Sequence, residues 1–294
     1  MKRRHLAAVS RTRRSLNGST DTLQYGTMNN TTGPSHRHYT LKHRITAFVS
    51  TKFCDGLTYT VRHGLLTGMR RRGGLGWIPT AHTDTPEEAF WRALDLRDKV
   101  IYDVGAFHGL LSLWFARTAR QVISFEPTAA NRKRLLENLR LNQIENVTVR
   151  PYGLASADAE VELVYSPLMP GGATAAPTLA ESIRSDPKAT IETIIVKRLD
   201  DENAPVPDLI KVDVEGLELE VLQGAAETLR RHKPALYLEM HGETMADKRR
   251  KVTDIVAYLT ASGYTNIRHI ESASAITPAN AERAAEGHLY CTAS

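Results

Sequence analysis

The sequence predicts an α/β protein with one doubly wound, mostly parallel sheet. Short apolar runs alternate with amphipathic segments, which is the pattern of strands joined by crossover helices. The first of these runs, beginning at Val100, leads into a turn from Gly105 to Gly109 and then into a helical pattern, as in nucleotide-binding sheets. The chain of 294 residues is long enough for one such domain with appendages.

The residues before this core are predicted to form appendages. Residues 1–38 lack apolar periodicity, and residues 1–50 carry nine Lys and Arg beside a single acid, so we predict a disordered basic arm over 1–38. Such a charge run is more often a solvated tail, and no nucleic-acid partner is expected. Residues 39–98 are predicted to be a cap and lead-in helix, with Thr85 as helix cap and Pro86 in the first turn.

From residue 99 to residue 294 the strand and helix patterns alternate, and we assign them to one core domain. The expected core strands are 100–104, 122–125, 146–150, 209–216, 235–241, 265–270 and 288–292. The expected helices are 110–116, 129–142, 217–231 and 247–262. Seven strands with intervening helices predict a sheet covered by helices on both faces.

An insertion of about residues 156–206 interrupts this alternation. Its strand-like runs, 161–165 and 191–196, flank a loop from 167 to 177 that is rich in Gly, Pro and Ala. Insertions between core elements often carry substrate contacts, so we predict that this segment lies on the substrate side. A plain surface hairpin explains the pattern equally well.

The glycine turn and an acid at the next strand end indicate the ligand. Glu126 ends the second core strand, where a carboxylate accepts hydrogen bonds from the hydroxyls of a ribose. A dinucleotide fingerprint requires a glycine where Phe107 stands, and Asp103 would repel a pyrophosphate but suits an ammonium group. The pattern therefore favours S-adenosylmethionine over a dinucleotide. A glycine turn that binds no nucleotide is the remaining alternative.

A second group of ionisable residues follows two later strands: Asp213 and Glu215 after one, Glu239 and His241 after the other. Ligands of doubly wound sheets lie beyond the carboxyl ends of the strands, so these groups are expected to ring the same pocket. We predict that His241 is the general base and that Asp213 and Glu215 are the other catalytic residues. Alternatively, the two acids stabilise the next helix through its dipole, or His241 is only a hydrogen-bonded strand-end histidine. A divalent metal held here is a further alternative, but no metal ligand is assigned.

Cysteine content and hydropathy indicate the compartment. Cys54 and Cys291 stand at opposite ends of the chain, so neither a disulfide framework nor a C-x-x-C metal motif is expected. No run approaches the roughly 20 apolar residues of a membrane span, and the N-terminus lacks the apolar core of a secretory signal. We therefore expect a cytoplasmic protein without a membrane span.

Several strings of the sequence are familiar together. They are Asp103-Val104-Gly105-Ala106-Phe107-His108-Gly109, Phe125-Glu126-Pro127, Ile210-Lys211-Val212-Asp213-Val214-Glu215-Gly216-Leu217-Glu218 and Glu239-Met240-His241. Over about residues 85–293 the chain resembles the FkbM family of S-adenosylmethionine-dependent methyltransferases. The resemblance implies the class I methyltransferase fold, a seven-stranded sheet whose last strand is antiparallel.

The resemblance also implies roles for single residues. Asp103, Gly105 and Gly109 would line the methionine part of the cofactor, Glu126 its ribose, and Asp213 the face of methyl transfer. The cofactor-binding set is completed by Ala106, Phe107 and Pro127. Phe107 and His108 stand where an Asn and a small aliphatic residue are frequent in the family, which affects the finer cofactor contacts.

The predicted activity is methyl transfer to a hydroxyl of a small molecule, sugar or lipid. A non-catalytic binding protein that retains the fold and a dinucleotide-dependent oxidoreductase are the alternatives. The identity of the acceptor and the oligomeric state are not predicted.

Overall fold

The computed structural model of the chain describes residues 56–73, 82–165 and 189–293. The predicted basic arm, 1–38, and the loop from 167 to 177 lie outside these described residues. Among the helices in the described ranges, none combines the length and the apolar character that crossing a bilayer requires.

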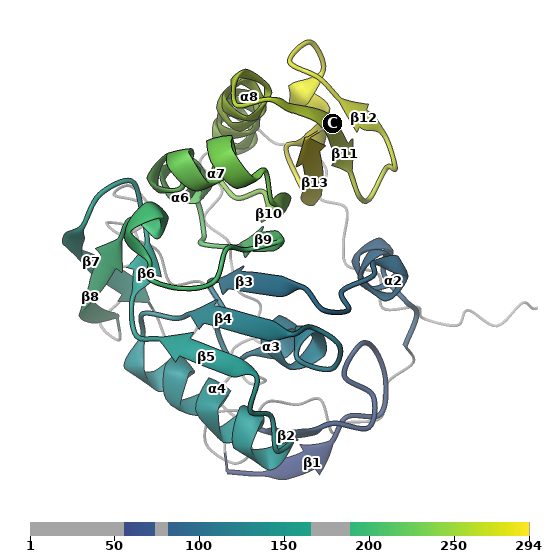
Figure 1. Ribbon diagram of the computed structural model, residues 1–294, viewed down its shortest axis with the longest axis vertical. Helices are drawn as coiled ribbons and strands as arrows, with labels where there is room; N and C mark the ends of the chain where they lie inside the picture. Colours follow the sequence, from purple (N-terminus) through teal and green to yellow (C-terminus); the bar gives the residue numbers. More distant parts are fainter. Residues whose placement is uncertain (1–55, 74–81, 166–188, 294) are drawn as a thin grey trace, which may run out of the picture. The chain divides into compact units, whose positions relative to one another are not determined.

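One large sheet organises the described part of the chain. Its strands lie in the order β12-β11-β13-β10-β9-β3-β4-β5 (Figure 1). Their bounds are β3 Val100–Val104, β4 Gln121–Phe125, β5 Val147–Arg150, β9 Leu209–Val212, β10 Ala235–Glu239, β11 Tyr264–His269, β12 Ala275–Ile276 and β13 His288–Ala293. Strands β5, β4, β3, β9 and β10 are mutually parallel, whereas β13 is antiparallel to both β10 and β11. The seven predicted strands and the antiparallel last strand are thus confirmed, and the short β12 is an addition.

Helices cover both faces of this sheet because its central strand is apolar on both sides. Tyr102 and Val104 of β3 belong to a core cluster with residues of the helices that follow β9 and β10. Ile101 points the other way and packs with Trp91 and Phe115. The helices are α2 Pro86–Ala93, α3 Leu110–Phe115 and α4 Ala129–Leu141 on one face, and α6 Glu218–Gly224, α7 Ala226–His232 and α8 Met245–Ala261 on the other.

Helix α2 begins as predicted. The Thr85 hydroxyl accepts from the Glu88 amide at 3.1 Å, and the Glu88 carboxylate accepts from the Thr85 amide at 3.3 Å. Pro86 follows in the first turn, where its missing N–H is not needed. A cap of this kind contributes about 0.5–2 kcal/mol to helix stability.

Two predicted elements are shorter in the structure. The helix expected over 217–231 is broken into α6 and α7 at Ala225. Gly224, beside the break, packs on the Ala155 carbonyl, where a Cβ would lie 2.0 Å from the oxygen. Strand β9 ends at Val212, so Asp213 and Glu215 lie in a turn and not on one face of a regular strand.

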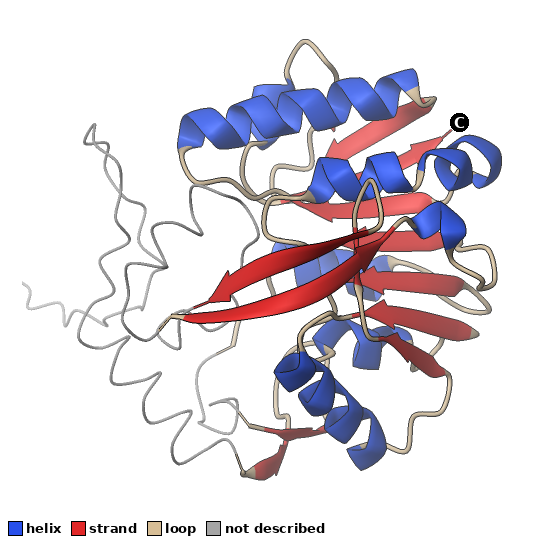
Figure 2. Ribbon diagram, turned by 90° about the vertical axis from the view of Figure 1, so that its left-hand side faces the viewer, coloured by secondary structure: helices blue, strands red, loops and turns tan. Residues whose placement is uncertain are grey.

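The predicted strands of the insertion are confirmed as an antiparallel hairpin of β7 (Ala159–Tyr165) and β8 (Thr190–Lys197). A short strand, β6 (Gly153–Leu154), pairs in parallel with β8. Figure 2 shows the hairpin as the two long strands in front of the main sheet. The predicted cap contributes a second hairpin, β1 (Thr58–Thr60) with β2 (Arg70–Arg72), which contacts α4. Two 3₁₀ turns, Leu199–Asp201 and Ala281–Ala284, complete the described elements.

Candidate active site

Four neighbouring parallel strands end at one edge of the main sheet. The register pairs Val104 of β3 with both Phe125 of β4 and Val212 of β9, and pairs Val212 with Leu238 of β10. The residues that come next along these strands are Gly105, Glu126, Asp213 and Glu239. The prediction that the acid-bearing strand ends adjoin the glycine turn is therefore confirmed.

Both glycines of the turn lie directly against other atoms of the protein. Gly105 and Gly109 have φ of +76° and +81°, a region that disfavours other residues. A Cβ on Gly105 would lie 1.8 Å from the Asp213 carbonyl oxygen, and one on Gly109 would lie 2.2 Å from Cδ1 of Leu135. The space beside the two glycines is thus filled by the Asp213 carbonyl and by Leu135 of α4. That a ligand also lies against this turn stays a prediction.

Glu126 is held at the end of β4 by the start of α4 and by the glycine turn. Its Oε1 accepts from the Thr128 amide at 2.9 Å and from the Thr128 hydroxyl at 2.6 Å. Its Oε2 accepts from the Phe107 amide at 2.8 Å. Burial raises the pKa of Glu126 and outweighs these hydrogen bonds, which lower it. Oε2 is thus the oxygen with room for a further donor. Pro127 follows Glu126 in the chain, and the buried Ala106 donates its amide to the Phe125 carbonyl at 3.1 Å.

Asp103 lies inside the protein, with 1% of its surface exposed. Its Oδ2 accepts from the Ser112 hydroxyl at 2.5 Å, and its Oδ1 lies 3.3 Å from Nζ of Lys211. Lys211 also donates to the Gly105 carbonyl at 3.0 Å and to Oδ2 of Asp213 at 3.2 Å. Burial lowers the pKa of Lys211, but the charges of Asp213 and Asp103 outweigh it and raise the pKa. Lys211 therefore links Asp103 to Gly105 and Asp213.

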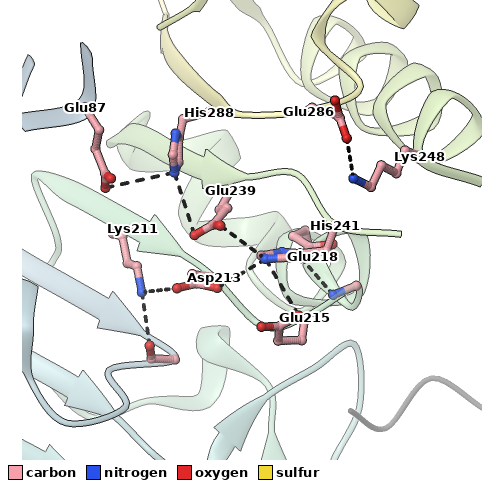
Figure 3. A network of polar contacts seen from close by, with 12 residues as sticks. Glu87, Lys211, Asp213, Glu215, Glu218, Glu239, His241, Lys248, Glu286 and His288 are labelled. Atoms are coloured by element: carbon pink, nitrogen blue, oxygen red, sulfur yellow. Dashed lines mark hydrogen bonds and ion pairs between the residues drawn. The ribbon is translucent and has the colours of Figure 1, made fainter. Parts of the chain in front are cut away.

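Carboxylates surround the imidazole of His241 (Figure 3). Its Nδ1 lies 2.9 Å from Oε1 of Glu218. Its Nε2 lies 3.3 Å from Oε1 of Glu239, and 3.8 Å from oxygens of both Asp213 and Glu215. The sequence thus correctly placed Asp213, Glu215, Glu239 and His241 in one group.

The charges in this group shift each other's pKa values. Burial lowers the pKa of His241, but hydrogen bonds with Glu218 and Glu239 and the charges of Glu215 and Glu218 raise it to about 11. Burial, with the charges of Asp213 and Glu239, raises the pKa of Glu215 to about 7 against the opposing charge of His241. An imidazole that keeps its proton cannot accept another. The general-base role of His241 stays a prediction, and it requires that this proton be displaced.

The helix-stabilising alternative for Asp213 and Glu215 finds little support in the geometry. Helix α6 begins at Glu218, and the acids of its first turn are Glu218 and Glu220. Glu215 instead adopts φ of +53°, a left-handed conformation that costs a non-glycine residue about 1–2 kcal/mol. Strain of this kind persists where the surroundings impose it, which is frequent at functional sites.

Two residues of the site received no role from the sequence. Lys211 is a cation in an otherwise apolar buried strand, and that contrast was the available signal. Glu218 was part of the motif, yet its contact with His241 joins positions 23 apart in the chain. Such a contact depends on the order of the strands, which local patterns do not show.

The strand order, with β13 antiparallel between β10 and β11, defines the class I methyltransferase fold. The glycine turn and the acids around His241 follow the carboxyl ends of its parallel strands. Residues 103–265, more than half of the chain, match the Methyltransferase FkbM domain. The chain belongs to the FkbM methyltransferase family.

Two relatives of this chain carry methyltransferase names. The chain is 31% identical over 159 residues to the hexuronic acid methyltransferase AglP of Haloferax volcanii. The alignment covers 49% of this chain and 63% of the relative. It is 32% identical over 148 residues to Methyltransferase 1 of Beauveria bassiana, covering 43% and 58% of the two chains. The chain thus spans less than two thirds of either relative. A solved FkbM methyltransferase from Methylobacillus flagellatus aligns with a TM-score of 0.44 and 22% identity, over 68% of this chain and 45% of that one.

Proposed function

We propose that this chain transfers a methyl group from S-adenosylmethionine to a hydroxyl oxygen of a small molecule, sugar or lipid. The observation that carries the proposal is the direct packing of Gly105 on the Asp213 carbonyl. A ligand bound along the glycine turn then has the acidic cluster at its end. Membership of the FkbM family supports methyl transfer, and the name of the hexuronic acid methyltransferase supports a sugar-like acceptor.

The residues at this edge fit such a cofactor. S-adenosylmethionine, when bound, supplies an electrophilic methyl group on a sulfonium sulfur. The carboxylates of Asp213, Glu215 and Glu239 are partly exposed, so they can face a cationic ligand. Glu126 offers Oε2 to a ribose hydroxyl. Asp103 is buried, so we propose that it orients Lys211 and does not contact the cofactor directly.

In the proposed mechanism, the main task of the protein is to position the acceptor hydroxyl. The carboxylates of Asp213 and Glu215 would accept a hydrogen bond from the acceptor hydroxyl and so position its oxygen for the transfer. Such a transfer would form a C–O bond at the expense of the C–S bond, leave the electron pair on sulfur, and free the hydroxyl proton. Either carboxylate can receive that proton, and so can His241 once its own proton has been displaced.

The insertion is the element that we place beside the acceptor. Glu192 of β8 accepts from the Ala129 amide at 3.1 Å, at the start of α4. The hairpin therefore meets the chain three residues after Glu126, at the ligand edge of the sheet. This contact favours the substrate-side interpretation of residues 156–206 over a hairpin remote from the site.

Two measurements test the proposed function. Calorimetry should show that S-adenosylhomocysteine binds and that NAD does not, because the turn lacks the second glycine of a dinucleotide site. Transfer of a tritiated methyl group to hydroxylated acceptors, hexuronic acid glycans included, should then identify a substrate. Binding of NAD in place of S-adenosylhomocysteine would establish the oxidoreductase, and cofactor binding without transfer to any acceptor would favour a non-catalytic protein.

Replacing Glu126 by alanine should weaken the binding of S-adenosylhomocysteine by about 1–3 kcal/mol, since a charged acceptor is lost and the Phe107 amide loses its partner. Calorimetry at a temperature where both proteins are folded measures the change. Glu160→Ala, on the exposed end of β7, is the matched control and should bind as the wild type does. An unchanged dissociation constant in Glu126→Ala would remove Glu126 from the cofactor site.

A further inference from the structure

Three side chains that follow β9 and β10 each have one polar atom bound by a neighbouring residue and a second polar atom that points toward the other two side chains. They are Asp213, Glu239 and His241, and one ligand atom from each lies within 4.8 Å of the others. The inward atoms are Oδ1 of Asp213, Oε1 of Glu239 and Nε2 of His241, and Nε2 lies 3.8 and 3.3 Å from the two oxygens.

The outward atoms of the same three residues have partners outside the group. Oδ2 of Asp213 accepts from Lys211 at 3.2 Å, and Nδ1 of His241 lies 2.9 Å from Glu218. The third outward atom, Oε2 of Glu239, lies 3.7 Å from Nε2 of His288. Metal-binding histidines and carboxylates are usually oriented in this way by an outer shell of partners.

The outer partners are themselves fixed by the fold. Lys211 and Glu218 have 6% and 1% of their side chains exposed. Glu218 also accepts from the Gly216 amide at 2.9 Å, and His288 lies 2.5 Å from Glu271. The orientation of the inward atoms is therefore set by buried groups, which distinguishes this arrangement from a set of acids that happen to meet on a surface.

The charge at the inward face also calls for a cation. Nε2 of His241 has oxygens of Glu239, Asp213 and Glu215 around it, while Nδ1 is taken by Glu218. With Nδ1 next to Glu218, the three carboxylate oxygens around Nε2 favour a positive charge at that place, either the Nε2 proton or a metal ion that displaces it. A metal ion at that place would be bound by the lone pair and by the carboxylates together.

We propose that Asp213, Glu239 and His241 form a binding site for one divalent metal ion, with Glu218, Lys211 and His288 as its outer shell. Two carboxylates and one imidazole suit Mn²⁺, which accepts oxygen ligands and tolerates nitrogen. Three protein ligands leave coordination positions for water and for an acceptor oxygen. Glu215, with Oε2 3.8 Å from Nε2 of His241, lies beside the site.

The chemical role of the ion rests on the proposed function. A divalent charge beside Asp213 would attract the acceptor oxygen and make its hydroxyl proton easier to remove, as metal ions do for bound water. It would also offset the negative charge that this edge of the sheet presents to an acidic sugar. Metal binding itself requires neither cofactor nor acceptor, so it can be tested separately.

The test measures Mn²⁺ binding to the full chain by the loss of the electron paramagnetic resonance signal of free Mn²⁺, without cofactor or acceptor. The wild type should bind one ion per chain. His241→Ala and Asp213→Asn should weaken binding more than tenfold, and Glu218→Gln, which alters only the outer shell, about 10–100-fold. Circular dichroism confirms that each variant is folded, and Glu239→Gln replaces any variant that is not.

The chain contains a matched control. His82 lies 3.2 Å from Asp84 and 3.0 Å from Glu88, but this second group is exposed at His82 and Asp84, and Glu88 is engaged in the cap of α2. His82→Ala should therefore bind Mn²⁺ as the wild type does. Binding that disappears in His82→Ala, survives in His241→Ala, or is absent from the wild type at millimolar Mn²⁺ overturns the proposal. None of these results affects binding of S-adenosylhomocysteine, on which the proposed function depends.

Discussion

Gly105→Ala is expected to destabilise the protein by about 2–5 kcal/mol, the sum of a left-handed backbone penalty and overpacking against a backbone group. The added Cβ would lie 1.8 Å from the Asp213 carbonyl oxygen at a residue whose φ is +76°. A backbone carbonyl cannot move aside as a flexible side chain can, so either β3 or the turn after β9 must shift. Urea denaturation of the two proteins measures the loss.

Gly68→Ala separates the two contributions to that loss. Gly68 has φ of +86°, and a Cβ there would meet nothing within 4 Å. This variant should lose only the backbone penalty of about 1–2 kcal/mol. If Gly105→Ala is no less stable than Gly68→Ala, the contact between the glycine turn and Asp213 is looser than described, and the observation that carries the proposed function is lost.

The core of the fold could be predicted because its signals are local. The strand from Val100 is apolar on both faces, and Gly105 and Gly109 mark the turn after it, so the strand, turn and helix follow from neighbouring residues. The capped start of α2 at Thr85 is equally local. The same holds for the grouping of acids at strand ends, since parallel strands place their carboxyl ends together.

The details of the site were less accessible because they depend on backbone geometry and distant contacts. Val212 to Glu215 alternates like a strand, yet β9 ends at Val212 and Glu215 turns to positive φ. The pairing of Lys211 with Asp103 joins two strands that are far apart in sequence but adjacent in the sheet. The role of His241 changes most, because Glu218 and three further carboxylates surround it only in the folded chain.

His241→Ala is expected to lower the rate of methyl transfer by about 10²–10⁴, the usual contribution of a positioned acid or base group. The imidazole contacts Asp213 and Glu239 but not the glycine turn or Glu126, so the dissociation constant of S-adenosylhomocysteine should stay within about twofold of the wild type. Single-turnover transfer of a tritiated methyl group measures the rate, and calorimetry measures the binding. His82→Ala, an exposed histidine between two acids, should keep the wild-type rate.

The response of His241→Ala to Mn²⁺ separates the two roles open to this residue. If His241 is a metal ligand, the variant binds the ion more weakly, and raising the Mn²⁺ concentration should restore part of the rate because Asp213 and Glu239 remain. If His241 receives the acceptor proton, saturating Mn²⁺ leaves the rate low, since no group replaces the imidazole. A wild-type rate in His241→Ala without added metal contradicts both roles, and the positioning of the acceptor then falls to Asp213 and Glu215.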